Sequence, residues 1–172
     1  MKWFVRIAIT LAMFLMLWPE FPRYRAEWTL TEAGGRLEGV LGGAVKGGAA
    51  VSSTQDALHL AQQAMSALPD DPRPIQTASV ALLLLQRGAE AIALLEPAIA
   101  AGERPELTIN LGRALGINGD EKGANAAFLR TAWANPAAIA TLPKSMREPL
   151  LEQVKELESQ LRDGRLQQPP PL

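Results

Sequence analysis

The chain has 172 residues, a formal net charge of −1 and one histidine, and it contains no cysteine. A near-neutral chain without clustered aromatic side chains has no basic footprint for nucleic acid. One histidine without cysteine supplies neither a metal cluster nor the full partner set of a catalytic serine. We therefore expect no enzyme, cofactor or metal site, and neither nucleic acid nor a small-molecule substrate as a ligand.

Residues 1–28 begin with basic side chains that precede an apolar run. The run extends without charge from Ile7 to Trp18, after Lys2 and Arg6. Its length is typical of a secretory signal sequence, but Pro19 follows it closely and no pair of small residues at cleavage spacing lies nearby. The absence of cysteine excludes a lipoprotein anchor. We expect an uncleaved transmembrane helix, while a cleaved signal sequence and a peripheral segment remain alternatives.

The flanks of this segment predict its placement. Aromatic residues that favour the membrane–water boundary bracket a span from Trp3 to about Phe21, namely Trp3, Trp18, Tyr24 and Trp28. Lysine and arginine are nearly balanced across the span, with a weak preference for a cytoplasmic N-terminus. We therefore expect a single-pass protein of a bacterial inner membrane whose remaining chain is periplasmic.

Residues 29–51 are rich in glycine, and four glycines recur every four residues: Gly35, Gly39, Gly43 and Gly47. In a helix they would form a flat strip that another helix could approach closely. Each glycine, however, disfavours a helix by about 1 kcal/mol relative to alanine, and the charged residues Arg36, Glu38 and Lys46 disfavour a membrane span. We expect a flexible or loosely helical spacer, with the helix-packing strip as the alternative.

A repeat of 33–34 residues organises positions 52–136. Ala57, Ala91 and Ala124 recur at intervals of 34 and 33, and two more ladders keep the same step: Ala61, Leu95 and Phe128, and Ala64, Ala98 and Thr131. Small and apolar residues at i, i+4 and i+7 in repeats of this size are typical of stacked helical hairpins, because each hairpin buries its apolar face only against its neighbours. The sequence thus predicts an all-α fold.

The best-formed unit, from Pro105 to Pro136, resembles the tetratricopeptide repeat. The matching residues are Leu111, Gly112, Ala124, Phe128 and Pro136, while Thr108 and Leu115 replace a tryptophan and a tyrosine of the pattern. We expect Gly112 to lie where the second helix crosses most closely and Phe128 to fill the space between units. A looser unit spans about 72–103, with Ser79 at the small position, and its Pro97 lies inside the second helix.

Two capping boxes predict helix starts outside these units. The first, Ser52 to Asp56, would begin a helix that ends at Leu68, so that only half a unit precedes the first full one. The second, Ser145 with Glu148, would begin a terminal helix in region 137–164 that carries an apolar stripe and a polar outer face. Gly164 would end this helix, and the proline-rich tail 165–172 should be extended and mobile.

The resemblance implies a ligand groove on the first helices of successive hairpins. Carried over residue by residue, its positions are Gln76, Val80, Leu83, Leu84, Glu106, Ile109, Asn110, Arg113 and Ile117. This face is largely apolar and contains one cation, Arg113, which could pair with a carboxylate or with backbone carbonyls of a partner. Leu83 and Leu84 could equally belong to the core, and Arg113 could equally be a solvated surface residue.

Together these features predict a membrane-anchored adaptor, a short tetratricopeptide-like helical solenoid behind one N-terminal transmembrane helix. Its partner would be another protein of the cell envelope, during assembly of a membrane, secretion or polysaccharide complex. The alternative is a small structural subunit of an integral membrane complex that uses the anchor and the glycine strip as its interface.

Overall fold

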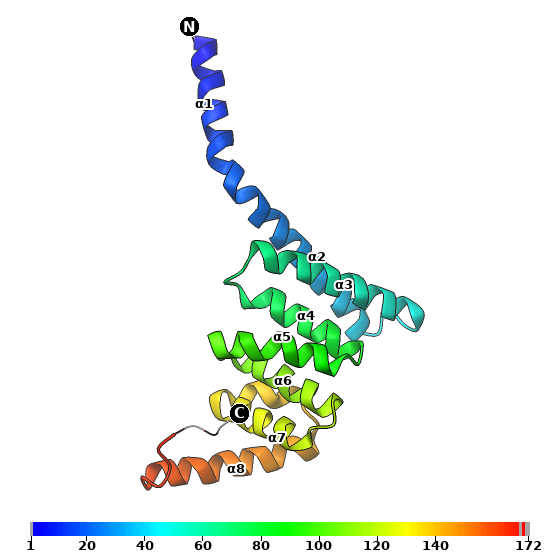
Figure 1. Cartoon of the computed structure of the whole chain (residues 1–172), viewed down its shortest axis with the longest axis vertical. Coiled ribbons are helices and arrows are strands. Elements are labelled where there is room, and N and C mark those ends of the chain that lie inside the picture. The colour runs from blue at the N-terminus through cyan, green and yellow to red at the C-terminus, as the bar shows by residue number, and fades with distance from the viewer. Residues whose placement is uncertain (1, 169, 171–172) are drawn as a thin grey trace. The chain divides into compact units, whose positions relative to one another are not determined.

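The computed structural model describes residues 2–168 and 170, and every regular element within them is a helix. In chain order these are α1 (Lys2–Leu17), η1 (Trp18–Glu20), α2 (Phe21–Leu41), α3 (Gly48–Ala67), α4 (Pro72–Leu84), α5 (Gly88–Ala101), α6 (Pro105–Ile117), α7 (Glu121–Ala134), η2 (Pro136–Thr141) and α8 (Lys144–Arg162) (Figure 1). Sequential helices pack as antiparallel pairs, which confirms the all-α class. The chain forms two compact units, residues 1–77 and 78–172.

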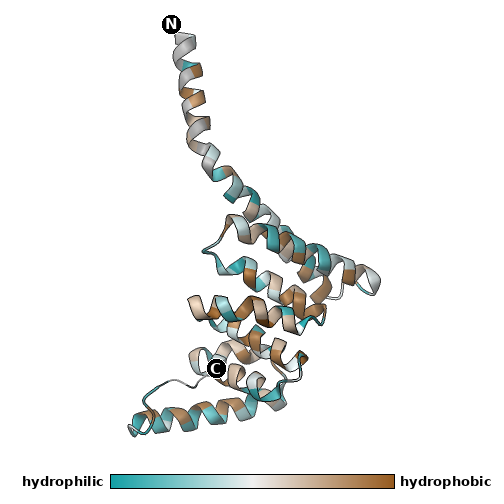
Figure 2. Cartoon of the chain, viewed as in Figure 1, coloured by the Kyte–Doolittle hydropathy of each residue, from teal (hydrophilic) through white to brown (hydrophobic). Residues whose placement is uncertain are grey.

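Helix α1 contains hydrophobic residues, some of which Figure 2 colours brown, and several of its large apolar side chains are exposed. They are Trp3, Ile7, Ile9, Leu11, Met13, Phe14 and Met16. Among the described residues, no helix combines the length and the hydropathy that crossing a bilayer requires.

The glycine-rich segment differs from the expected spacer, because α2 continues through it to Leu41 and packs against α3. Leu30, Ala33 and Leu37 recur at i, i+3 and i+7, and all three are buried. Burial of this stripe offsets the low helix propensity of the glycines. The pair α2 and α3 is therefore a complete hairpin where the sequence predicted half a unit. Helix α2 ends at Leu41, and Gly43 and Gly47 beyond it have φ +72° and +61°, so the four glycines form no continuous helical strip.

Both capping-box predictions are wrong, because α3 and α8 begin earlier. Helix α3 starts at Gly48, so Ser52 lies inside it. Helix α8 starts at Lys144, where the carbonyl of Pro143 accepts hydrogen bonds from the amides of Met146 and Arg147. Ser145 therefore lies inside the first turn rather than at the N-cap, and Pro149 lies in the helix interior.

The repeat ladders lie where the sequence places them, on the second helix of each hairpin. All of their residues are buried except Ala98, which is half-buried. Pro97 lies inside α5, as predicted. Because the ladders in α3 are alanines, the core of the first hairpin consists of small contacts around Ala26, Leu30 and Ala64.

The hairpin of α6 and α7 has the larger core. A Cβ on Gly112 would lie 2.5 Å from Cε1 of Phe128, so the ring of Phe128 occupies the space that the glycine leaves open. Phe128 belongs to a buried hydrophobic cluster that joins α6 and α7 to η2 and α8. The other buried members are Ile109, Ala124, Ala132, Ile139, Leu142, Leu150 and Val154. The predicted role of Gly112 is confirmed, while Phe128 fills space inside its own hairpin and toward η2 and α8.

Two interhelical turns share one geometry at equivalent repeat positions. Before α7, the amide of Asp120 donates to the carbonyl of Leu115 (2.9 Å) and Gly119 has φ +85°. Before α5, the amide of Arg87 donates to the carbonyl of Leu82 (2.9 Å), and Gln86 has φ +58°. Both are Schellman motifs, but the first has glycine at the left-handed position and the second has glutamine.

The C-terminal helix ends at Gly164, as predicted. Gly164 has φ +71°, and the amide of Arg165 donates to the carbonyl of Gln160. Beyond it the tail differs from the free segment expected, because Pro170 is buried and its carbonyl accepts a hydrogen bond from Nη1 of Arg130 (2.8 Å). Of the tail, Pro169, Pro171 and Leu172 lie outside the described residues.

Candidate partner-binding surface

A row of hydrogen-bonded polar side chains crosses the second unit. Asn110 on α6 is buried, and its Nδ2 donates to Oγ of Ser79 on α4 (2.9 Å). One turn later, Nη1 of Arg113 donates to Oδ1 of the same asparagine (3.0 Å). Residues at i and i+3 lie on one face of a helix, so α6 itself aligns the two side chains.

Arg113 continues this row to η2, where its Nη2 donates to Oγ1 of Thr141. Burial lowers the pKa of the guanidinium from its usual value. Among the described residues, no carboxylate lies within ion-pair distance of Arg113. The group carries more N–H donors than these two bonds use. Arg113 is therefore a half-buried cation, held in place by neutral partners, that retains donors for an anionic or carbonyl ligand.

The nine residues of the predicted groove fall into three classes. Ile109 and Asn110 are buried, so they are unavailable to a ligand. Leu84, Glu106 and Ile117 are exposed, and Val80, Leu83 and Arg113 are half-buried. Gln76 is also half-buried, but it belongs to the first unit, residues 1–77. On α6 the accessible face thus consists of Glu106, Arg113 and Ile117.

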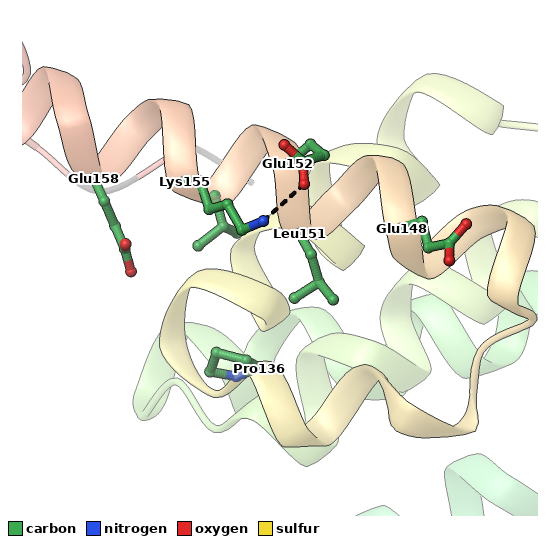
Figure 3. Close-up of a pocket in the computed structure, with 7 residues that line it drawn as sticks. Pro136, Glu148, Leu151, Glu152, Lys155 and Glu158 are labelled. Carbon is green, nitrogen blue, oxygen red and sulfur yellow. Dashed lines mark hydrogen bonds and ion pairs between the residues drawn. The ribbon is translucent and has the colours of Figure 1, made fainter.

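A hollow beside α8 is lined by apolar and charged side chains. Figure 3 shows Glu148, Leu151, Glu152, Lys155 and Glu158 along the helix, with Pro136 on the side of the hollow that Leu151 faces. Nζ of Lys155 donates to Glu152 (2.8 Å), which raises the pKa of the lysine. These charged side chains are solvent-exposed, as expected for the polar face of a terminal helix, and they hold no group in a defined geometry.

A third feature, which the sequence did not predict, joins the α5–α6 turn to α7. The guanidinium of Arg130 donates from Nε (2.6 Å) and Nη2 to the two carboxylate oxygens of Glu103. These hydrogen bonds lower the pKa of Glu103 and raise that of Arg130. The remaining nitrogen, Nη1, holds the carbonyl of Pro170. No motif flags this pair, because its members are 27 residues apart.

The described residues contain no group of three or more side chains that could hold a metal ion. His59 is exposed on α3 and forms a hydrogen bond with Gln63 one turn away (Nε2 to Nε2, 2.8 Å).

No protein-family model, curated protein or solved structure matches the chain significantly.

Proposed function

We propose that this protein is a membrane-anchored adaptor whose tetratricopeptide-like hairpins bind a segment of another envelope protein. The observation that carries the proposal is Arg113, which is half-buried on α6, oriented by Asn110 and Thr141, and without a carboxylate partner among the described residues. A partly desolvated guanidinium forms strong, directional hydrogen bonds with a carboxylate or with backbone carbonyls.

The neighbours of Arg113 define the kind of segment that would bind. Ile117 lies one turn beyond it and is exposed, so it offers apolar contact area. Glu106 lies toward the other end of α6 and would repel a second acidic group. We expect a segment that places one carboxylate, or a pair of backbone carbonyls, at Arg113 and an apolar side chain at Ile117.

The exposed apolar side chains of α1 support the anchor part of the proposal. Large apolar side chains left in water are unfavourable, and a lipid environment would cover them. With the orientation expected from the charged flanks, the hairpins lie on the periplasmic side of a bacterial inner membrane.

A photo-crosslinking side chain at Ile117 tests the adaptor function in cells. We expect it to capture a defined envelope protein, and we expect the additional change Arg113→Glu to abolish that product. The matched control carries the same probe and Arg162→Glu, which reverses an exposed charge on α8. Recovery of the same product at the same yield with Arg113→Glu would contradict the role of Arg113.

The folded state of the Arg113 variant has to be measured alongside. Arg113 donates a hydrogen bond to buried Asn110, so we expect Arg113→Glu to lower the melting temperature as well. Leaving Oδ1 of Asn110 without its donor costs about 1–3 kcal/mol. Arg113→Lys retains the charge, so partial recovery of crosslinking by this variant separates ligand binding from stability.

The second candidate function is a structural subunit of an integral membrane complex, which the open surface of α2 at Gly34 and Gly35 favours. A fragment without α1 discriminates the two, because an adaptor retains partner binding and a membrane subunit loses it. The fragment should begin at Glu20, so that the whole of α2 and its hairpin with α3 are retained.

A further inference from the structure

Helix α2 has two faces of different chemistry. Its inner face, with Ala26, Leu30, Ala33 and Leu37, is buried within the first unit. On the outer face of its first two turns, Phe21, Tyr24 and Trp28 are 58%, 69% and 68% exposed. Their spacing of three and four residues aligns them along one side of the helix. Three large aromatic side chains in a row on a helix that is already packed on its other side are not needed for the fold.

The composition of this outer face identifies what covers it. Tyrosine and tryptophan combine an apolar ring with a polar group, and both concentrate where hydrocarbon meets headgroups. Arg25 lies on the same face, and it forms no ion pair with any described residue, so its charge is available to anionic lipid. The row ends at Glu32, which pairs with Arg36 (2.8 Å).

We propose that the first half of α2 lies in the interfacial layer of the bilayer and seats the first hairpin directly on the membrane surface. The inference rests on the proposed membrane anchor, because α1 delivers α2 to the bilayer. It differs from the anchor in placing a helix of the packed domain, rather than the apolar segment alone, in contact with lipid.

The length of the aromatic row sets the orientation of the helix. From Phe21 to Trp28 a helix advances about 10 Å. The interfacial layer on each side of the hydrocarbon is only about 5–8 Å thick. A helix along the membrane normal would carry Trp28 out of this layer, so α2 has to run obliquely or nearly parallel to the surface for all three rings to stay within it.

Tryptophan quenching by lipid tests this placement in the full-length chain. Three variants each retain one tryptophan, at position 18, 28 or 133, with phenylalanine at the other three tryptophan positions. They are reconstituted in vesicles of phosphatidylethanolamine with a minority of phosphatidylglycerol, and quenchers are placed on the acyl chains or on the headgroups. We expect Trp18 and Trp28 to lose emission to a comparable extent, with Trp28 responding most to the headgroup quencher. Trp133 on α7 should be unaffected.

Each other outcome has a distinct meaning. Quenching of Trp18 without quenching of Trp28 overturns the seating of α2 and leaves the anchor intact. Quenching of neither residue overturns the anchor, and the seating with it. If Trp28 is shielded only in native membranes and not in the lipid vesicles, a protein rather than lipid covers the face, and the proposal is wrong.

Discussion

Gly112 is restricted by close contact rather than by backbone conformation. Any side chain there would overlap the ring of Phe128, whereas a Cβ on Gly116, one turn along the same helix, would meet only the Cβ of Ala124 at 3.9 Å. We expect Gly112→Ala to destabilise the protein by about 1–3 kcal/mol. Gly116→Ala should stabilise it by up to about 1 kcal/mol through helix propensity. If denaturant unfolding shows that both substitutions change the free energy of unfolding in the same direction, the contact between Gly112 and Phe128 is disproved.

Gln86 occupies a left-handed conformation that suits glycine better. A non-glycine residue there costs about 1–2 kcal/mol, partly offset by the greater entropy that glycine loses on folding. Gln86→Gly should therefore raise stability by up to about 1 kcal/mol, although it removes the weak hydrogen bond from Nε2 to the carbonyl of Leu83 (3.3 Å). The reciprocal change at the equivalent turn, Gly119→Ala, should lower stability by about 1–2 kcal/mol. Melting temperatures of the two variants should move in opposite directions.

Helix α7 packs against α6, η2 and α8, and Phe128 is its central side chain. The ring contacts α6 at Gly112 and belongs to the cluster that includes η2 and α8. Phe128→Ala should cost about 3–5 kcal/mol, because the rigid helices around it cannot close the cavity. Lys155→Ala on the exposed face of α8 serves as the control. Equal unfolding midpoints for the two variants would be inconsistent with the observed core.

The pair of Glu103 and Arg130 makes the tie between α7 and the α5–α6 turn pH-dependent. Since Arg130 lowers the folded pKa of Glu103, the stabilisation is fully present above the unfolded pKa of glutamate, about 4.3, and is lost as pH falls through the lower folded value. Glu103→Gln should therefore reduce stability at neutral pH and flatten its decline in acid. Parallel pH profiles of wild type and variant would show that the pair contributes nothing.

Whether an element could be predicted from the sequence depends on which contacts stabilise it. The alanine ladders and the pair Gly112 and Phe128 follow from residues a few turns apart, so their pattern is visible in the sequence. Helix α2 was missed as a packing element because local glycine propensity opposes it, while its stabilisation comes from burial against α3. In the candidate site, Arg113 was identified, but the burial of Asn110 depends on Ser79, which comes from another hairpin.

For the whole molecule, the proposed anchor and the charge balance of its flanks predict one topology. When a reporter is fused after Leu172 through a flexible linker, a reporter that works only in the periplasm should be active and one that works only in the cytoplasm should be inactive. The full-length chain should remain in the membrane fraction. A matched pair of reporters, one active on each side of the membrane, gives the result its own control. A mature N-terminus near Gly34, found by sequencing the purified protein, would instead indicate a cleaved signal.

The hydrogen bond between Arg130 and Pro170 also determines how accessible this part of α7 is to other chains. The stretch from Gly164 to Pro170 is short, and a short tether keeps its end at an effective concentration in the range of about 1 mM. A free peptide that offers Arg130 the same kind of carbonyl must therefore reach a comparable concentration, or bind much more tightly, before it displaces the tail. The tail thus sets an affinity threshold that weak, non-specific extended segments do not pass.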